Sequence, residues 1–363
     1  MPYVSQPELY NLSMHQAHLR DPQIIVEDSS EASTDKPYYQ YLKGLSCIPL
    51  LVEPTTRIIQ GRFFVAAAVY PLLPKDEPQA RGAPSQRKVR VGSRIFRLRC
   101  IELGNQINPS DCQWAMQETS WPSNLTITLN GTNLDMRRKS HHGKDLPIDL
   151  TPFVKEGANE IHVAVLRVGQ TVLTKASYAI AVEIIHVGDL GSVMDLVRRA
   201  EGNKVQDLIR KLSFHKDPEV EVVGSRLAIS IVDPFSLSLI KVPVRGESCR
   251  HYECFDLDLF LLTRQGSPCK PEQFRCPICN GDARPDQLIV DTWFEKVLQS
   301  IRELKRTDAR SIVVESTGDW RIQEEKVEGE TGDGTGLRRR KEDAAPQRPS
   351  IPERSNTEVV VID

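Results

Sequence analysis

The sequence predicts an α+β protein with an antiparallel β-sandwich, then a small domain closed around one metal ion, then a helical C-terminal extension, and disordered tails. Three observations predict this order. Short apolar segments separated by turn residues run from 37 to 188. Two pairs of Cys and His residues follow between 249 and 279. An amphipathic helical pattern begins at Asp291.

Composition narrows the class of protein. The chain has 363 residues, of which 39% are apolar and 26% are charged, and its formal net charge is -2. These values are ordinary for a globular protein of two or three domains. The absence of any run of eighteen apolar residues predicts that no segment spans a membrane, and the near-zero charge gives no support for nucleic-acid binding. Three of the eight cysteines have metal-ligand spacing and the others are scattered, which favours a reducing compartment.

Residues 1–36 are polar and lack periodicity, so we expect a disordered arm. Residues 37–188 are predicted to form the β-sandwich, and residues 74–86 a loop within it. Asn130-Gly131 is a hairpin-turn signal, and the His141-His142 pair, which has no further ligands around it, is expected in a solvated loop. The predicted strands are 46–51, 58–69, 94–103, 125–129, 161–166 and 178–187.

Residues 189–222 are predicted to form a helical linker of two helices. Val193, Leu196 and Val197 have helical spacing, as have the apolar residues from 205 to 212, and Gly202 lies between the two groups. Two further strands, 228–232 and 237–242, are expected to open the metal domain, which we place at residues 223–290.

Four side chains can close a tetrahedral metal shell: Cys249, His251, Cys276 and Cys279. Cys-x-His and Cys-x-x-Cys each direct two ligands into one cavity, and the residues between the pairs fold back to bring them together. A redox Cys-x-x-Cys needs no matching Cys-x-His, so we predict one structural zinc ion. All four positions are then filled by protein, which leaves none for a catalytic water.

A second metal of the cross-braced kind is not expected, because no further ligand pairs are present. We predict instead that side chains of the preceding loop pack in its place. Cys254 is expected to be a buried thiol and Cys269 a loop residue. Asp256 is predicted to cap a short helix between the two ligand pairs. The packing residues of the loop would be Phe235, Leu237, Leu239 and Ile240.

Residues 291–322 are predicted to form the extension, with a helix from Asp291 followed by a hairpin of residues 311–315 and 319–322. Residues 323–363 are rich in Glu, Gly, Arg and Pro, which predicts disorder. This tail contains a basic cluster at 338–341. It ends in an acid-flanked β-branched run suited to adding a strand to a sheet edge, Val359, Val360, Val361 and Ile362.

Two stretches resemble a known family. VPVRGESCRHYECFDLDLFL and FRCPICNGDARPDQLIVDTWFEKVL are similar to the SP-RING, or MIZ-type zinc finger, of Siz/PIAS SUMO ligases, and most similar to the branch of MIZ-domain, PIAS-like proteins. Asp233-Pro234 departs from the Cys-Pro that many members carry. Pro147-Ile-Asp-Leu-Thr151 resembles the segment that names the PINIT domain. The chain ends soon after these regions, as expected of a fragment or an unusually short protein.

The resemblance implies a SUMO-protein ligase of the adaptor type, with no catalytic residue of its own. It would bind the SUMO-conjugating enzyme, SUMO and nuclear protein substrates related to chromatin or transcription, which implies a nuclear location. By position, the conjugating enzyme would contact Phe235, Leu261, Pro277 and Ile278. The terminal run Val359 to Ile362 would bind SUMO.

Three other functions are weighed against this one. The chain could be a non-enzymatic transcription co-regulator or scaffold that uses the zinc domain only to bind proteins. It could also be a ubiquitin ligase. Direct DNA binding ranks lower, because the paired His of a classical finger helix and a SAP-like helical pair are both missing from the sequence.

Overall fold

The computed structural model describes residues 22–27, 37–53, 58–79, 83–104, 109–122, 125–141, 143–165, 177–200, 226–266, 273–315 and 319–323. Several predictions fall outside these residues. They are the second linker helix, Cys269, the basic cluster at 338–341 and the terminal run Val359 to Ile362.

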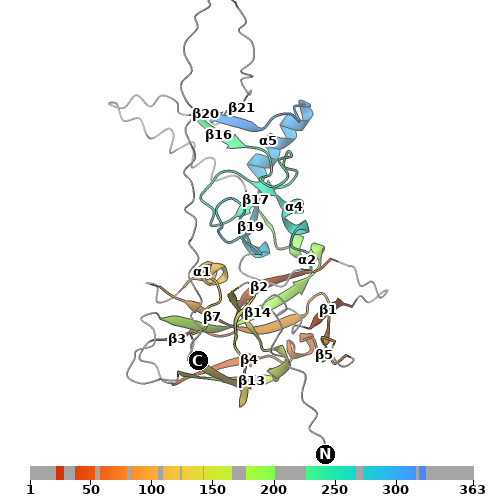
Figure 1. The fold of residues 1–363 in the computed structure, drawn as a ribbon. Helices are drawn as coiled ribbons and strands as arrows, with labels where there is room; N and C mark the ends of the chain where they lie inside the picture. Colours follow the sequence, from red (N-terminus) through yellow and green to blue (C-terminus); the bar gives the residue numbers. More distant parts are fainter. Residues whose placement is uncertain are drawn as a thin grey trace, which may run out of the picture. The chain divides into compact units, whose positions relative to one another are not determined.

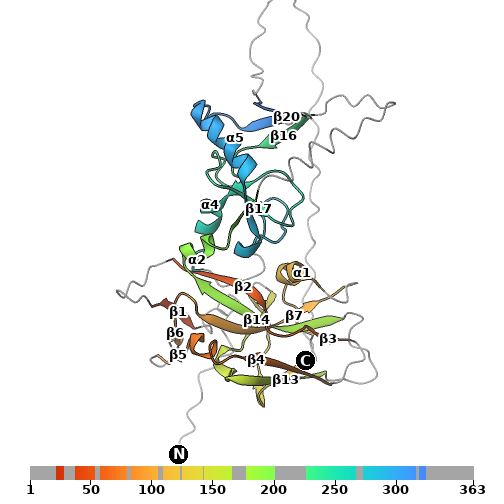
Figure 2. The ribbon, with the colours of Figure 1, turned by 180° about the vertical axis from the view of Figure 1, so that it is seen from behind.

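Two antiparallel sheets face each other across a common core, which confirms the predicted sandwich (Figures 1 and 2). The core lies between them because alternate residues of each strand point inward, so that Leu98 and Ile180 of one sheet pack in the same cluster as Ile127 and Val163 of the other. One sheet has the order β12 (Ile148–Asp149), β7 (Arg94–Glu102), β14 (Tyr178–Gly188) and β2 (Tyr39–Leu45), with β3 (Leu50–Val52) also on β14. The other has the order β4 (Ile58–Val65), β13 (Gly157–Val165), β8 (Leu125–Leu129) and β9 (Thr132–Leu134).

The predicted hairpin turn at Asn130-Gly131 joins β8 to β9. Both residues have positive φ, 51° at Asn130 and 84° at Gly131, the pair of conformations that a type I′ turn requires. The turn also fixes a neighbouring strand, because the Asn130 side chain donates to Asn159 Oδ1 at 2.9 Å and accepts from Glu160 N at 3.1 Å.

The five-stranded sheet is covered on its second face as well, which explains why nine of the eleven β14 positions are apolar or glycine. Trp114 and Ala115 of helix α1 (Asp111–Met116) pack there. Ile24 and Val26 of β1 (Gln23–Val26) pack on this face as well. Strand β1 pairs in parallel with β6 (Gln86–Val89), and β5 (Asp76–Glu77) pairs with the other side of β6. Part of the predicted disordered arm is therefore a strand, and part of the predicted 74–86 loop is β5.

Other local predictions in the sandwich need correction. The strand expected at 46–51 is replaced by β2 and β3 on either side of a bend, and the strand expected at 58–69 ends at Val65. Pro71 opens a 3-10 turn, η3 (Tyr70–Leu72), soon afterwards. Another 3-10 turn, η4 (Thr151–Phe153), follows β12. His141 ends a strand, β10 (Arg137–His141), paired with β11 (Lys144–Leu146), where a loop was expected.

The metal domain is built on a four-stranded sheet of order β15 (Arg198–Ala200), β19 (Leu288–Asp291), β17 (Pro243–Gly246) and β18 (Phe255–Asp256). Helix α4 (Leu257–Leu262) begins at the predicted cap, Asp256, and the 3-10 turn η5 (Pro285–Gln287) precedes β19. In the predicted linker only α2 (Leu190–Met194) is helical among the described residues, and 198–200 is a strand. The strand expected at 237–242 is reduced to one bridge between Val232 and Leu239.

The C-terminal extension confirms its prediction. Helix α5 (Thr292–Glu303) begins after the cap Asp291 and buries Phe294, Val297, Leu298 and Ile301 against the sheet of β16 (Arg226–Ser230), β20 (Ser311–Glu315) and β21 (Trp320–Ile322). Figure 1 shows α5 beside β16 and β20. None of the helices in the described part of the chain has the length and apolar character needed to cross a bilayer.

A fully buried carboxylate, Glu183 of β14, attaches α1 to the sheet. Arg97 and Arg99 of β7 pair with it, Arg99 at 2.7 Å, and Trp114 Nε1 of α1 donates to it at 2.7 Å. Burial opposes ionisation of Glu183, but the two guanidinium groups outweigh this effect and lower its pKa. Arg99 also donates to the carbonyl oxygens of Trp114 and Gln117, at the end of α1.

We expect Glu183→Gln to lower the free energy of unfolding by about 3–5 kcal/mol, because the buried guanidinium of Arg99 and the largely covered one of Arg97 lose their counter-charge. Because folding lowers the pKa of Glu183, its ionised carboxylate contributes fully to the free energy of unfolding at pH values above the usual carboxyl pKa. That contribution is lost as the pH falls toward the folded-state pKa. Urea unfolding at several pH values measures both effects. The exposed Arg62–Glu160 pair supplies the control, and Glu160→Gln should cost less than about 1 kcal/mol. Equal losses for the two variants would contradict the assigned role of Glu183.

Candidate metal centre

The structure brings the four predicted ligands together. One ligand atom from each of Cys249, His251, Cys276 and Cys279 lies within 4.8 Å of all the others. Cys249 Sγ is 3.5 Å from Cys279 Sγ, and Cys276 Sγ is 3.3 Å from His251 Nε2. Zinc bonds of about 2.3 Å to sulfur and about 2.0 Å to nitrogen place the corners of a tetrahedron roughly 3.5–3.8 Å apart. The cluster therefore has the size and the donor chemistry of a zinc site.

The first ligand pair follows β17 through a tight turn in which Cys249 N donates to Gly246 O at 3.0 Å. A Cβ at Gly246 would lie 2.3 Å from the Asp282 carbonyl oxygen and 3.0 Å from Cys249 Sγ, so only glycine fits between the two ligand loops. The preceding Arg245 is buried and pairs at 2.6 Å with Asp291, the cap of α5. Arg245-Gly246 thus fixes the first ligand pair to the rest of the domain.

The second pair lies on a narrow loop closed by backbone hydrogen bonds. Cys276 N donates to Gly281 O at 2.8 Å, and Asn280 N donates to Cys276 O at 2.9 Å. Asn280 has a φ of 58°, a left-handed conformation that asparagine tolerates better than most residues. Because the loop reverses within so few residues, Cys276 and Cys279 face the same point.

His251 is oriented from behind. Its Nδ1 donates to the backbone oxygen of Glu253 at 2.9 Å, so that the neutral imidazole would offer the lone pair of Nε2 to a cation; without one, a protonated Nε2 donates to Cys276 Sγ at 3.3 Å. Metal-binding histidines are commonly held in this way by a carbonyl on their second nitrogen.

The ligands share protons in the absence of a cation. The pKa of the Cys276 thiol is lowered to about 4, first because Cys249 donates toward its sulfur and further because His251 does. The same hydrogen bond raises the pKa of Cys249, and the contact with Cys276 raises that of His251. A divalent cation would replace these protons, since it binds the thiolate and the neutral imidazole.

With four protein ligands the site has no open position, so a zinc ion here would stabilise the fold and would not activate water. Structural zinc sites of this kind contribute about 10–16 kcal/mol of apparent binding free energy to folding. Within the described ranges this is the only group of three or more His, Cys, Asp or Glu residues arranged to hold a metal.

The predicted packing in place of a second metal is wrong in part. Ile240 is buried, but Phe235 and Leu237 are 63% and 64% exposed. The loop is held instead by hydrogen bonds to the buried carboxylate of Asp233. Its Oδ1 accepts from Phe235 N at 3.0 Å and from Ser236 N at 2.9 Å, and its Oδ2 accepts from Asp256 N at 2.9 Å. A buried carboxylate was not anticipated, because an Asp-Pro pair in sequence indicates only a turn.

The proposed partner-contact residues separate into two groups. Phe235 and Ile278 are exposed and Pro277 is half-buried, whereas Leu261 is 1% exposed and belongs to the domain core. Leu261 is therefore not available as a contact. Helical position alone did not distinguish it from its neighbour Leu262, which is 58% exposed. Cys254 is buried and lies outside the ligand cluster, as predicted.

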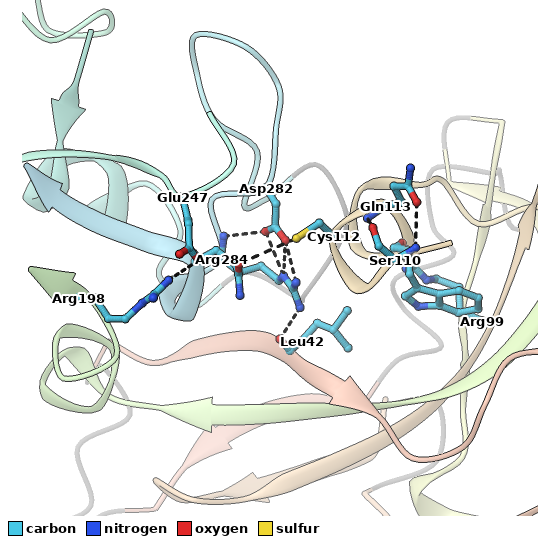
Figure 3. A network of polar contacts seen from close by, with 11 residues as sticks. Leu42, Arg99, Ser110, Cys112, Gln113, Arg198, Glu247, Asp282 and Arg284 are labelled. Carbon is cyan, nitrogen blue, oxygen red and sulfur yellow. Dashed lines mark hydrogen bonds and ion pairs between the residues drawn. The ribbon is translucent and has the colours of Figure 1, made fainter. Parts of the chain in front are cut away.

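The second ligand loop is also tied to the sandwich. Arg284 forms a buried pair with Asp282 and donates to Leu42 O of β2 at 3.4 Å, as Figure 3 shows, and Arg275 donates to Met116 O of α1 at 2.8 Å. Cys112 Sγ of α1 lies 3.9 Å from Gln287 Oε1. Tyr39 and Tyr41 of β2 share a core with Cys249 and Cys276. The contacts of Arg284 with Leu42, of Arg275 with Met116 and of Cys112 with Gln287 join residues more than a hundred positions apart, so local sequence patterns could not predict them.

We expect Cys276→Ser to release zinc and to unfold the metal domain, because a hydroxyl is a far weaker ligand than a thiolate. Zinc content by atomic absorption and domain stability by thermal unfolding measure this. Cys254→Ala is the matched control, since it removes a buried thiol that is not a ligand and should keep full zinc content. Unchanged zinc in Cys276→Ser, or zinc lost in both variants, would remove the ligand assignment.

Comparisons with known proteins agree with this geometry. Residues 229–282 match the MIZ/SP-RING zinc finger model, and residues 57–186 match the ZMIZ1/ZMIZ2 GBD-like domain model. Zinc finger MIZ domain-containing protein 2 of Homo sapiens is 23% identical over 277 residues, which cover 70% of this chain and 29% of that protein. E3 SUMO-protein ligase PIAS4 of Mus musculus is 26% identical over 319 residues, covering 80% and 59% respectively.

E3 SUMO-protein ligase pli1 of Schizosaccharomyces pombe is 24% identical over 188 residues, which cover 51% of this chain and 24% of that ligase. The crystal structure of the S. cerevisiae SUMO E3 ligase SIZ1 aligns with 83% of this chain and 95% of its own, with 18% identity and a TM-score of 0.35. The chain spans 29% and 19% of the length of the human zinc finger MIZ domain-containing proteins 2 and 1. Two stretches of the chain thus match the MIZ/SP-RING zinc finger and the ZMIZ1/ZMIZ2 GBD-like domain, and the chain is similar to the PIAS and ZMIZ proteins.

Proposed function

We propose that this protein is a SUMO-protein ligase that binds the SUMO-charged conjugating enzyme and orients its thioester for attack by a substrate lysine. The observation that supports the proposal most directly is the closed Cys249, His251, Cys276 and Cys279 cluster within a MIZ/SP-RING zinc finger, together with exposed apolar side chains on the loops of the same domain. Relatives named as E3 SUMO-protein ligases align with up to 80% of the chain. One zinc ion per chain and a nuclear location belong to this proposal.

The chemistry then resides in the partner. No residue of this chain needs to form a covalent intermediate, because the reactive thioester is on the conjugating enzyme. Holding the thioester and the acceptor amine in a near-attack geometry can lower a barrier by up to about 7–11 kcal/mol. The ligase would contribute by restricting the orientations that the charged conjugating enzyme samples.

The contact surface is assigned to two loops of the metal domain. Ile278 lies between the last two ligands, where metal binding fixes the backbone, and is 37% exposed with the half-buried Pro277 before it. Phe235 and Leu237 project from the loop that Asp233 holds. Exposed apolar side chains on a rigid backbone suit a protein interface, because little conformational freedom is lost on binding. The terminal run Val359 to Ile362 is proposed as a second, SUMO-binding element.

A single-turnover discharge assay tests the activity. The purified chain should accelerate transfer of SUMO from the charged conjugating enzyme to a lysine-bearing acceptor, and no acceleration would refute the proposal. Replacing SUMO and its conjugating enzyme by ubiquitin and ubiquitin-conjugating enzymes in the same assay distinguishes a ubiquitin ligase.

We expect Ile278→Ala and Phe235→Ala each to slow discharge about tenfold at sub-saturating conjugating enzyme, which corresponds to a loss of about 1.4 kcal/mol of binding free energy. Zinc content should be unchanged in both, since neither side chain is a ligand. Leu304→Ala removes a side chain that is 62% exposed after α5 and should leave the rate unaltered. Rates equal to that of the wild-type protein for Ile278→Ala and Phe235→Ala would count against these contacts.

A second function is favoured by a specific observation. The first relatives found are zinc finger MIZ domain-containing proteins 2 and 1, whose names carry no ligase activity, and the β-domain matches a model named for them. A transcription co-regulator or scaffold that only binds proteins would fit that relationship. Such a scaffold would bind the conjugating enzyme or other proteins without accelerating discharge, so the same assay separates the two functions.

A further inference from the structure

The loop that carries Phe235 is built around a single buried carboxylate. Asp233 is 1% exposed, and its Oδ1 accepts from Phe235 N at 3.0 Å, from Ser236 N at 2.9 Å and from Ser236 Oγ at 3.3 Å. Its backbone closes the same loop, because Asp233 N donates to Ser238 O and Asp233 O accepts from Leu237 N, each at 2.9 Å. One residue thus determines the path of the chain through Phe235 and Leu237.

This arrangement exposes the apolar side chains of the loop to solvent and buries its polar carboxylate. Phe235 and Leu237 are 63% and 64% exposed, while the carboxylate between them and the domain is buried. Leu237 has a φ of 55°, the left-handed region that branched side chains avoid, so the loop is held in a conformation that leucine alone does not favour.

The loop is also fixed from the rest of the domain. Asp233 Oδ2 accepts from Asp256 N at 2.9 Å, and the Asp256 carboxylate caps α4 and accepts from Lys241 N at 2.6 Å. From the C-terminal extension, Arg310 donates to Leu237 O. The loop therefore has fixed contacts to both the helix α4 and the extension, and none of them involves a metal ligand.

We propose that Asp233 is a positioning residue that presents Phe235 and Leu237 to the charged conjugating enzyme. This proposal rests on the proposed ligase function. The carboxylate orders the loop before binding, so that the apolar contacts form without the cost of fixing the backbone. Its role is then seen in the affinity for the conjugating enzyme and not in the rate of transfer once that enzyme is bound.

Asp233→Asn tests the proposal by keeping the volume of the side chain and replacing one acceptor oxygen by an amide group. Whichever way the amide is oriented, its NH2 then faces a backbone N–H that the carboxylate had satisfied. We expect the concentration of charged conjugating enzyme at half-maximal rate to rise about tenfold, a change of about 1.4 kcal/mol, while the maximal rate and zinc content stay as in the wild-type protein. Amide hydrogen exchange should accelerate at Phe235 and Ser236 if the NH2 replaces Oδ1, or at Asp256 if it replaces Oδ2. Asp308→Asn, at an exposed carboxylate, is the control for loss of one charge.

A double-mutant cycle with Phe235→Ala distinguishes positioning from general destabilisation. If Asp233 acts through the loop, Asp233→Asn should weaken binding less in the Phe235→Ala background than in the wild-type protein, the remaining loss being that of Leu237; fully additive losses, or a lower maximal rate with unchanged half-saturation, would overturn the proposal. If Asp233→Asn does not fold, Ser236→Ala provides a milder variant, because it removes one donor to Asp233. It is expected to raise the concentration of charged conjugating enzyme at half-maximal rate in the same direction. Weakened binding by Phe235→Ala but not by Asp233→Asn refutes the positioning role alone. No acceleration by the wild-type chain refutes the proposed function instead.

Discussion

The convergence of three sulfurs and one imidazole on a single point is the constraint on which the metal domain depends. Among the described residues between the two ligand pairs, the helices and strands are one short helix, α4, and one two-residue strand, β18. Backbone hydrogen bonds close each ligand loop, but the four ligand side chains are what bring the two loops to one point. Gly246 shows how close the two loops come, since even one methyl group would collide with Asp282 O. A bound cation would offset the repulsion that three thiolates at this spacing would otherwise produce. The same core cluster contains Cys249, Cys276, Tyr39 and Tyr41, so the ligand loops and strand β2 of the sandwich are packed as one core.

That shared core gives the sandwich a structural role toward the metal domain. β2 is the last strand of its sheet, and unpaired edge strands invite association with other chains. Here Gly266 N donates to Tyr38 O just before β2, and Arg284 donates to Leu42 O within it. On the other side, Glu183 and Arg99 hold α1 to the sheet, and the last residue of α1 accepts from Arg275, next to Cys276. Contacts with the sandwich therefore flank the second ligand loop, and its backbone is constrained even before partners bind.

Short-range patterns predicted much of this structure, while contacts distant in sequence were not predictable. The caps Asp256 and Asp291, the Asn130-Gly131 turn and the strand of residues 125–129 each follow from neighbouring residues, and the structure places them as expected. The ligand cluster was predictable for the same reason, because metal-ligand spacing is a local pattern. Strand β1 and helix α1 were missed, since each is stabilised by partners far along the chain: β6 for one, Glu183 for the other. Leu261 was misassigned because a six-residue helix has too few turns for periodicity to separate its buried from its exposed positions.

Asp233 shows how a single buried carboxylate can fix the path of a loop. A second zinc ion would fix this loop through side chains, whereas a carboxylate fixes it through backbone N–H groups, here those of Phe235, Ser236 and Asp256. Backbone donors place no demand on side-chain identity, so Phe235 and Leu237 are free to be apolar and exposed. Charge-assisted hydrogen bonds are roughly twice as strong as neutral ones, and three of them from backbone donors compensate for burying the carboxylate. The buried carboxylate thereby gives the domain an apolar loop whose backbone is held by hydrogen bonds.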